Sequence, residues 1–220
     1  DLLAELARRG ISIPIRHMDN SGAILNYPGL KLEMTRPGIM TYGIYPSNET
    51  RDKAHLTPVM SFKTTIVLVK EFPAGYGIGY NRTYITQEKT RVATIPVGYG
   101  DGYPFLLSNR GEALIRGRRA PVIGRVSMDM CTLDVTDIPD CVVGDEVVLL
   151  GRQKDEYISA NEIAARAQTI SYEILCALGK RAPRVFLQKG KPSPVLPCKA
   201  DGTCHPAGHS RILRLHLLPL

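Results

Sequence analysis

The sequence contains no tryptophan and only four phenylalanines, whereas tyrosine occurs ten times. It has no apolar run long enough to cross a membrane, so we predict no transmembrane helix. The first residues, DLLAELARRG, carry acids inside an amphipathic pattern, which is not the pattern of a signal peptide. The five cysteines are odd in number and irregularly spaced, which argues against a disulfide framework and predicts reduced thiols in the cytoplasm.

The body of the chain also lacks the positive excess that a nucleic-acid-binding surface needs. The net charge is +7, but residues 181–220 hold seven Lys or Arg against one acid, which leaves 21 cations against 20 acids in residues 1–180. We therefore predict no nucleic-acid partner. With 220 residues, 44% of them hydrophobic, the chain is large enough for one or two domains with a buried core.

Helical and strand-like patterns alternate in the first 55 residues. The predicted order is helix, strand, short helix and strand-like segment, over residues 1–9, 11–18, 22–27 and 30–43. Asn20 or Ser21 is placed to cap the short helix. This order is typical of a parallel α/β unit, but a closed α/β barrel needs about 250 residues. We therefore interpret residues 1–55 as the last part of such a barrel.

The pattern changes after residue 55. Short β-rich runs, separated by glycine, proline and asparagine turns, indicate an antiparallel sandwich or small barrel over residues 56–187. Within it, residues 159–179 show helical periodicity, with Ser159 as cap and Glu162 three residues later, and residues 182–187 form a last strand. Residues 188–220 have no sustained period and much proline, glycine and lysine, so we predict a disordered or non-native tail.

Three stretches attract attention as candidate sites. HMDNSGA (17–23) and RPGIMTYG (36–43) follow predicted strands, and a serine before a helix together with backbone N–H groups could cradle a phosphate. Taken alone, each of these two stretches is better explained as an ordinary helix cap or an ordinary Pro-Gly turn. GYGIGYNRTY (75–84) places three tyrosines in a glycine-rich turn, where Tyr80 is either a functional phenol or a strand-edge aromatic.

Further motifs decide between these interpretations. IPVGYGDGYP (95–104), GRVSMDM (124–130), TISYE (169–173) and RAPRVF (181–186) follow in order. Together with the first three stretches they resemble the C-terminal half of bacterial alanine racemases, over about residues 1–187. The resemblance implies an α/β barrel that holds pyridoxal 5'-phosphate and a C-terminal β domain. It also implies a head-to-tail homodimer in which the β domain of one subunit completes the active site of the other.

The resemblance assigns cofactor-binding roles to residues of both parts. It places Ser21, Gly38, Ile39 and Tyr172 at the phosphate, Arg36 at the pyridine nitrogen, and His17 beside Arg36. Because arginine cannot accept a proton, the ring nitrogen would stay neutral. The carbanion would then be less delocalised, which favours return of a proton over side reactions.

The resemblance also implies the reaction. Tyr80 would be one of two bases on opposite faces of the α-carbon, interconverting L-alanine and D-alanine for peptidoglycan. A phenol has a pKa of about 10, so it needs cationic neighbours to act near neutrality, and Arg82 is close in sequence. The glycines around Tyr80 would let the loop approach the cofactor closely. Met128, through its backbone N–H, and Asp129 match positions that contact the substrate carboxylate, and Tyr99 and Arg125 match the substrate entry.

One part of the family pattern is absent from this sequence. The defining lysine, in an Ala-Val-x-Lys-Ala-x-Ala-Tyr-Gly-His stretch, has no counterpart among the 220 residues, so we expect a fragment that is inactive alone. Two alternatives stay open: a racemase for serine or for a broader range of amino acids, and a β module that serves only for binding or dimerisation. The histidines and cysteines of CKADGTCHPAGH (198–209) match no zinc pattern, so we predict no metal site. We interpret RGRR (116–119) as a solvated turn.

Overall fold

The computed structural model describes residues 2–30, 32–179, 181–188, 191–192 and 211–216. The chain divides into two compact units, residues 1–58 and 59–220, which are described separately. Unit 1 contains two short α-helices and two 3-10 helices, namely α1 (Leu2–Arg8), α2 (Ser21–Asn26), η1 (Ile39–Tyr42) and η2 (Asn48–Thr50). The side chain of Asn20, one of the two predicted caps, accepts a hydrogen bond of 3.0 Å from the Ala23 amide at the start of α2.

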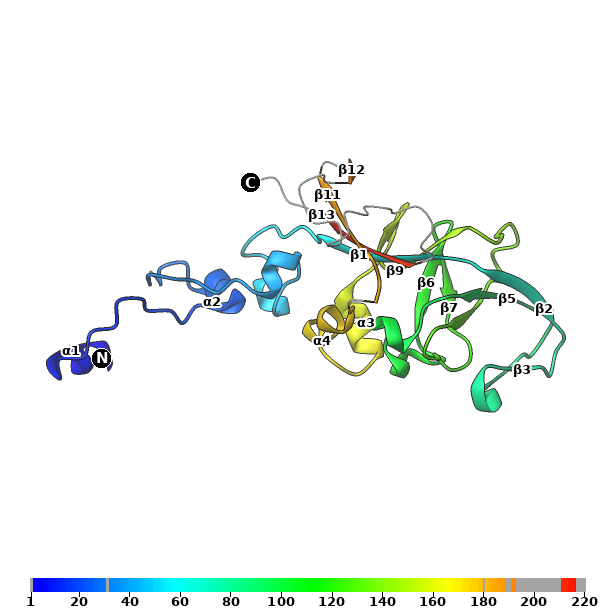
Figure 1. Ribbon diagram of the computed structural model, residues 1–220, viewed down its shortest axis with the longest axis horizontal. Coiled ribbons are helices and arrows are strands. Elements are labelled where there is room, and N and C mark those ends of the chain that lie inside the picture. Colours follow the sequence, from blue (N-terminus) through cyan, green and yellow to red (C-terminus); the bar gives the residue numbers. More distant parts are fainter. Residues whose placement is uncertain (1, 31, 180, 189–190, 193–210, 217–220) are drawn as a thin grey trace, which may run out of the picture. The chain divides into compact units, whose positions relative to one another are not determined.

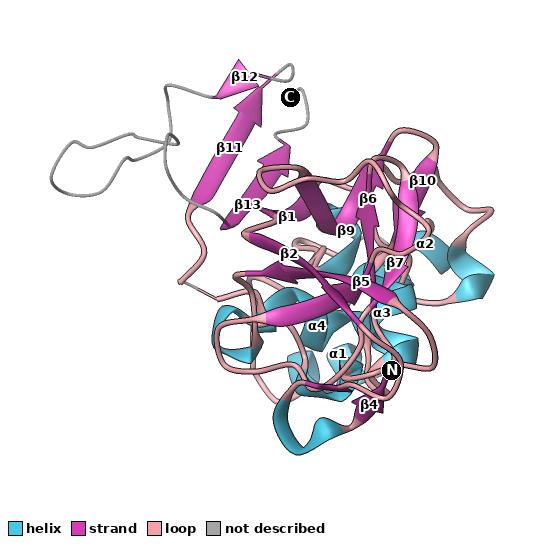
Figure 2. Ribbon diagram, turned by 90° about the vertical axis from the view of Figure 1, so that its right-hand side faces the viewer, coloured by secondary structure: helices cyan, strands magenta, loops and turns pink. Residues whose placement is uncertain are grey.

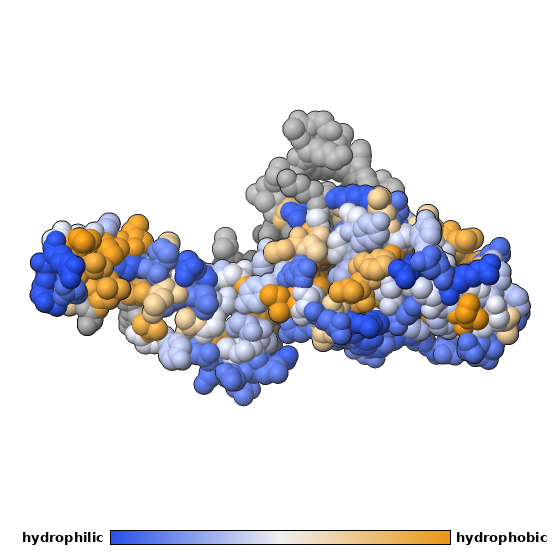
Figure 3. Space-filling model, turned by 90° about the horizontal axis from the view of Figure 1, so that it is seen from below, coloured by the Kyte–Doolittle hydropathy of each residue, from blue (hydrophilic) through white to orange (hydrophobic). Residues whose placement is uncertain are grey.

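The strands predicted for residues 11–18 and 30–43 do not form. The described residues of unit 1 hold one isolated parallel bridge, between Asn20 and Arg36. Parallel strands are stable when neighbouring strands and helices cover both faces, whereas Ile11, Ile13 and Ile15 are exposed here. Figure 3 shows hydrophobic surface over this N-terminal segment. An alternating sequence therefore does not make a strand where no partner strand supplies hydrogen bonds.

Unit 2 is built from β-strands, as predicted. Its large sheet has the order β12-β11-β13-β1-β9-β6-β7, with β10 paired to β9, and a second sheet has the order β2-β5-β8. Among the described residues, the strand pairs are antiparallel except β11 with β13. The strands of these two sheets, shown in Figure 2, are β1 (Met60–Thr65), β2 (Leu68–Phe72), β5 (Thr90–Ile95), β6 (Glu112–Ile115), β7 (Arg118–Pro121), β8 (Cys131–Asp134), β9 (Glu146–Gln153), β10 (Glu156–Ile158), β11 (Arg184–Gln188), β12 (Lys191–Pro192) and β13 (Arg211–His216).

Two short helices, α3 (Ala160–Arg166) and α4 (Ser171–Ala177), lie on one side of these strands (Figures 1 and 2). The predicted cap is confirmed, because the Ser159 hydroxyl accepts a hydrogen bond of 3.0 Å from the Glu162 amide. The prediction of one continuous helix over residues 159–179 is wrong, because the segment forms two helices. Gln168 takes a φ of +55°, which ends α3 and turns the chain before α4 begins. The core beside them contains fully buried aliphatic and aromatic side chains, among them Phe62, Ile95, Leu114, Leu133 and Leu149.

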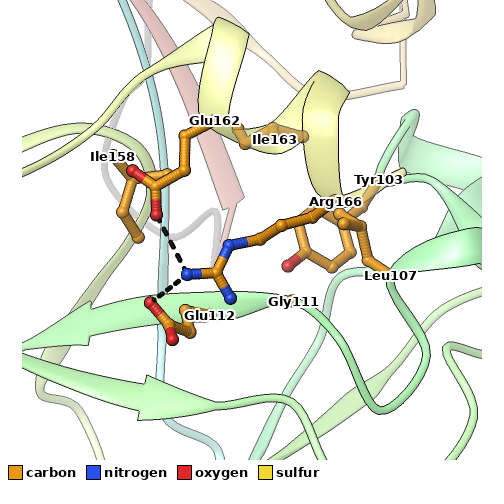
Figure 4. Close-up of a pocket in the computed structure, with 8 residues that line it drawn as sticks. All are labelled: Tyr103, Leu107, Gly111, Glu112, Ile158, Glu162, Ile163 and Arg166. Carbon is orange, nitrogen blue, oxygen red and sulfur yellow. Dashed lines mark hydrogen bonds and ion pairs between the residues drawn. The ribbon is translucent and has the colours of Figure 1, made fainter. Parts of the chain in front are cut away.

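A cluster of charges fastens α3 to the large sheet. The Arg166 guanidinium pairs with Glu112 of β6 at 2.9 Å and with Glu162 of α3 at 3.2 Å (Figure 4). Arg119 of β7 pairs with the same two glutamates at 2.7 and 2.6 Å. Burial alone would raise the pKa of Glu112, but the hydrogen bonds and charges of the two arginines lower it. The predicted solvated turn at 116–119 is therefore partly engaged in ion pairs, since Arg116 also pairs with Asp145 at 2.7 Å.

Two further strands form a ribbon that projects from the rest of unit 2 (Figure 1). They are β3 (Gly77–Ile78) and β4 (Tyr84–Ile85), joined by the 3-10 turn η3 (Tyr80–Arg82). Two more 3-10 turns, η4 (Tyr99–Asp101) and η5 (Phe105–Leu107), follow β5. The GYGIGYNRTY stretch is thus a hairpin with Tyr80 at its turn.

The C-terminal segment is described in part. Backbone pairing places Arg211–His216 in β13, between β1 and β11, where the sequence predicted no structure. Residues 189–190, 193–210 and 217–220 lie outside the described residues, so the prediction of a disordered tail stays a prediction there. The Cys198, Cys204, His205 and His209 cluster also lies outside them. Across the described ranges, no helix has the length and apolarity to cross a membrane, and His, Cys, Asp and Glu form no group of three placed for a metal.

Candidate active site

Ser21 links the two polar stretches of unit 1. Its hydroxyl is buried and accepts hydrogen bonds from the amides of Gly38 at 2.9 Å and Met40 at 3.3 Å. Because these bonds use the oxygen as acceptor, the hydroxyl hydrogen remains available as a donor. The amide of Ile39, between the two bonded amides, has no acceptor among the described residues. The structure thus brings together the serine, Gly38 and Ile39 that the sequence predicts for phosphate.

Arg36 lies beside this cradle, on the parallel bridge. Its amide donates to the Asp19 carbonyl at 2.7 Å, and its guanidinium donates to the Met18 carbonyl at 3.3 Å. His17 is exposed, and no hydrogen bond joins it to Arg36 within the described part of the chain. The Asp19 side chain is 2% exposed, and its Oδ1 atom has no hydrogen-bond partner in the structure. Apart from its place in HMDNSGA, nothing in the sequence points to this buried carboxylate.

The turn that carries Tyr80 has an unusual backbone. Gly79, Asn81 and Arg82 have φ values of +71°, +59° and +50°. Glycine and asparagine adopt such values more readily than other residues, and the result leaves the Tyr80 side chain 71% exposed. The Arg82 side chain folds back over Gly77, where a Cβ would lie 2.6 Å from it. Gly77 therefore makes room for Arg82.

Asn109 ties this turn to the GRVSMDM segment. Its side-chain amide donates to the Thr83 carbonyl at 3.3 Å and to the Thr83 hydroxyl at 3.2 Å. Its side-chain oxygen accepts from the Gly124 amide at 2.6 Å. A Cβ on Gly79 would lie 3.1 Å from the Arg125 amide, so the two segments touch directly. No sequence motif predicted a role for Asn109, whose φ of +55° is one that asparagine tolerates.

The GYGDG and SMDM segments are also joined by their backbones. The amides of Tyr99 and Gly100 donate to the carbonyls of Ser127 and Met128, both at 2.9 Å. Gly98 has no room for a side chain, because a Cβ would lie 2.1 Å from the Ser127 carbonyl oxygen. Met128 is exposed, and its amide has no acceptor among the described residues. These bonds bring the predicted entry residue Tyr99 next to the predicted substrate-contact residue Met128.

Asp129 is held by an arginine from the RAPRVF stretch. The Arg181 guanidinium donates to the Asp129 carboxylate and lies 3.7 Å from the carboxylate of Asp101, which is fully buried. The Asp129 hydrogen bond is the largest cause that raises the pKa of Arg181. Asp101 in turn accepts from the Gly98 amide at 3.0 Å. The sequence analysis gave Arg181 no role of its own, although it quoted the motif that contains it.

The remaining predicted residues of unit 2 are Tyr172 and Arg125. Tyr172, in the first turn of α4, is 44% exposed. The end of α4 packs on the GYGDG segment, because a Cβ on Gly102 would lie 1.9 Å from the Ala177 carbonyl oxygen. The Arg125 guanidinium lies over the ring of Phe105, and that ring meets Tyr99 edge-on. The predicted site residues Tyr80, Tyr99, Arg125, Met128 and Asp129 of unit 2 therefore lie on connected loops, and Tyr172 lies in α4, whereas Ser21, Gly38 and Ile39 form a group in unit 1.

The fold and these loops define a class of protein: the end of an α/β barrel followed by a β domain. The alanine racemase C-terminal domain family matches residues 59–186, and the alanine racemase N-terminal domain family matches residues 1–46. Because the first match covers more than half of the 220 residues, the chain belongs to the alanine racemase family.

Individual relatives agree with this assignment. The chain is 51% identical over 188 residues to an alanine racemase of Halothermothrix orenii, covering 86% of this chain and 50% of that protein. It is 50% identical over 186 residues to one of Syntrophobacter fumaroxidans, covering 84% of this chain and 49% of that protein. The chain thus spans about half the length of the curated relatives it matches.

Solved structures give the same result. Alanine racemase from Bacillus anthracis with bound L-Ala-P superposes with a TM-score of 0.82 at 38% identity, covering 87% of this chain and 49% of that one. Alanine racemase of Clostridium difficile 630 in complex with cycloserine superposes with a TM-score of 0.79 at 37% identity, covering 86% of this chain and 50% of that one. The predictions of family and fold class are confirmed.

Proposed function

We propose that this chain supplies one acid-base residue and part of the cofactor site for the interconversion of L-alanine and D-alanine. The observation that carries the proposal is the Tyr80 turn. The phenol is exposed at the end of a ribbon, and Asn109 fixes that ribbon to the segment carrying Met128 and Asp129. A tyrosine that serves only to pack against its neighbours would have its ring covered by them, whereas the Tyr80 side chain is largely exposed.

Pyridoxal 5'-phosphate fits the groups found in unit 1. Ser21 has a free hydroxyl hydrogen, and Ile39 has an amide without an acceptor among the described residues, so both can donate to a phosphate. We assign Ser21, Gly38, Ile39 and Tyr172 to the phosphate, Arg36 to the pyridine nitrogen and His17 to its support. When bound, the cofactor supplies an electron sink that acidifies the α-hydrogen of an amino acid.

Tyr80 then moves a proton on one face of the α-carbon. Its hydroxyl is the group that takes or returns the proton, and the opposite face needs a second base, which the family pattern gives to a lysine absent from these 220 residues. The free amide of Met128 donates to the substrate carboxylate. Asp129 follows Met128 in the chain, and its own carboxylate accepts a hydrogen bond from Arg181. Tyr99 and Arg125 line the entry.

Two wider roles follow from this assignment. A homodimer in which the β domain of one subunit presents Tyr80 to the cofactor of the other would complete the site. D-Alanine is a precursor of peptidoglycan, so the enzyme would act in the bacterial cytoplasm. Analytical ultracentrifugation of the complete protein tests the first role, since a monomeric active enzyme would contradict it.

The central test compares Tyr80→Phe with Tyr76→Phe in a complete enzyme that carries this segment. Tyr76 belongs to the same hairpin, and its ring stacks on that of Phe72 with the ring centroids 4.5 Å apart. Its substitution therefore controls for disturbance of the ribbon. Loss of a general acid-base group costs about 10²- to 10⁴-fold in rate. We expect that loss in both directions for Tyr80→Phe, with solvent deuterium exchange lost for one enantiomer more than for the other. Unchanged turnover would overturn the proposal.

A further inference from the structure

Arg125 lacks the carboxylate partner that several other arginines of unit 2 have. Arg116, Arg119, Arg166 and Arg181 of unit 2 all pair with carboxylates. Arg125 has no carboxylate partner and no side-chain hydrogen bond within the described residues, and its Nε atom is buried without an acceptor. The side chain is half-buried. A guanidinium in this condition keeps its full positive charge and most of its donors for a ligand.

An aromatic ring holds this cation in place. The central carbon of the guanidinium lies 5.7 Å from the centroid of the Phe105 ring. The same ring meets Tyr99 edge-on, with centroids 6.4 Å apart and planes at 73°. A cation–π contact attracts a guanidinium without neutralising it, whereas a carboxylate at the same place would cancel its charge. Phe105 is exposed, so the arrangement is open to solvent on one side.

The stack adjoins the predicted catalytic turn. A Cβ built on Gly79, the residue before Tyr80, would lie 3.1 Å from the Arg125 amide nitrogen. The neighbouring Gly124 amide is held by Asn109. Tyr99, at the other edge of the stack, is bonded through its amide to Ser127, one residue before Met128. An anion that reaches Arg125 is therefore beside the loops that carry the predicted chemistry.

We propose that Phe105 is a positioning residue that holds the Arg125 guanidinium as a receiving site for the carboxylate of an incoming amino acid. This inference rests on the proposed function for the identity of the ligand, since every α-amino acid carries a carboxylate. The site would act before the chemistry by binding the anion weakly at the entry. Phe105, which the sequence analysis did not single out, would then help to determine which small carboxylates enter.

The test is a titration of the 220-residue chain with sodium propionate, followed by the NMR signals of the arginine Nε–H groups, with sodium chloride at equal ionic strength as reference. We expect the Arg125 signal to shift and saturate with propionate. The guanidinium of Arg152 lies 5.5 Å from the centroid of the Tyr157 ring and serves as a matched control that should not respond. Phe105→Leu should weaken propionate binding by about three- to tenfold, whereas Phe105→Tyr should keep it.

Several results would overturn the proposal. They are equal responses of Arg125 and Arg152, an unmoved Arg125 signal, and equal binding by wild type and Phe105→Leu. Preserved chemical-shift dispersion in Phe105→Leu shows that the variant is folded, and Arg125→Lys gives a second variant that keeps the charge but loses the planar group.

In the complete enzyme, Phe105→Leu should raise KM by more than it changes kcat. The titration measures no turnover, so its failure is separate from failure of the Tyr80→Phe experiment.

Discussion

The two units of the chain are held together by different means. In unit 1 the buried hydrophobic side chains among the described residues are Leu25 and Ile39, while Ile11, Ile13, Ile15 and Met18 are exposed. In unit 2, two sheets and two helices bury a continuous set of large aliphatic side chains. Both units nevertheless present predicted site residues in defined arrangements.

The difference shows which contacts need a core and which do not. The Ser21 cradle of unit 1, proposed for phosphate, depends on hydrogen bonds from the Gly38 and Met40 amides to the Ser21 hydroxyl. Such bonds form within one local motif. The Tyr80 turn of unit 2 depends on Asn109, which lies 26 residues further along the chain than Thr83 and is placed by the sheets. The predicted cofactor-binding residues and the predicted proton-transfer residue thus lie in regions that differ in how many hydrophobic side chains they bury.

The largest expected effect tests the core of unit 2. Leu149 of β9 is fully buried, and Leu149→Ala should lower the free energy of unfolding of this unit by about 2–5 kcal/mol, since it removes apolar contacts and leaves a cavity. Chemical denaturation followed by circular dichroism measures the change. The same substitution at the exposed Leu106 should change it by less than about 0.5 kcal/mol.

Leu25→Ala extends this comparison to unit 1. Leu25 is buried, but unit 1 has few other buried hydrophobic side chains among its described residues. Leu25→Ala should therefore lower the free energy of unfolding by less than Leu149→Ala does. Amide exchange across α2 measures the local effect. Equal costs at Leu25 and Leu149 would show that unit 1 has a core as effective as that of unit 2, and the contrast between the units would be wrong.

The sequence predicted the β character of unit 2 because its strands alternate, or run apolar, between glycine and proline turns. It predicted the Ser159 cap because that signal lies within three residues. It failed on residues 11–18, where the alternation of isoleucines is genuine but no partner strand is available among the described residues. Local periodicity reports what a segment can form, whereas pairing depends on what lies beside it.

The candidate site shows the same division. The local pattern made Ser21, Gly38 and Ile39 candidates, because the serine lies at the start of a short helix and the glycine follows a proline, and the resemblance assigned them to the phosphate. Asn109, Arg181 and Phe105 could not be predicted, since their partners Gly124, Asp129 and Arg125 lie 15, 52 and 20 residues away along the chain. Tyr80 was found through a resemblance of ordered motifs, because a tyrosine in a glycine-rich turn has no chemical signal of its own.

A smaller effect is expected at the connection between the Tyr80 turn and its support. Asn109→Ala removes the bonds to Thr83 and Gly124 and places an alanine at a φ of +55°. These bonds are largely exposed, so the loss of stability should be about 1–2 kcal/mol. Amide exchange of residues 77–85 should rise while the core strands β5 and β9 stay protected. Uniform loss of protection would mean that Asn109 supports the whole domain.

Asn109→Asp provides the matched control for that experiment. Aspartate keeps an acceptor for the Gly124 amide and tolerates the same backbone angle, but it loses the amide donors to Thr83. Its effect on exchange should therefore be smaller than that of Asn109→Ala. In the complete enzyme, kcat should fall in the same order, because a looser turn holds the phenol less often in its reactive position.

The smallest expected effect concerns a charge pair in unit 1. The hydrogen bond from the Arg16 side chain, 2.7 Å from Nε to the Glu33 carboxylate, is the largest cause that lowers the pKa of Glu33 from 4.5 to about 2. A lowered pKa in the folded state means that the pair stabilises the fold above the ordinary pKa of the carboxyl, and that this contribution is lost as the pH falls from about 4.5 towards 2. An NMR titration of the Glu33 carboxyl carbon should show this low midpoint, and Arg16→Gln should move it back up. Because both groups are partly exposed, salt should also raise the midpoint in wild type. If Arg16→Gln leaves the midpoint unchanged, the pair does not hold residues 16 and 33 together, and the local order of unit 1 depends on the Ser21 cradle and the Asn20 cap.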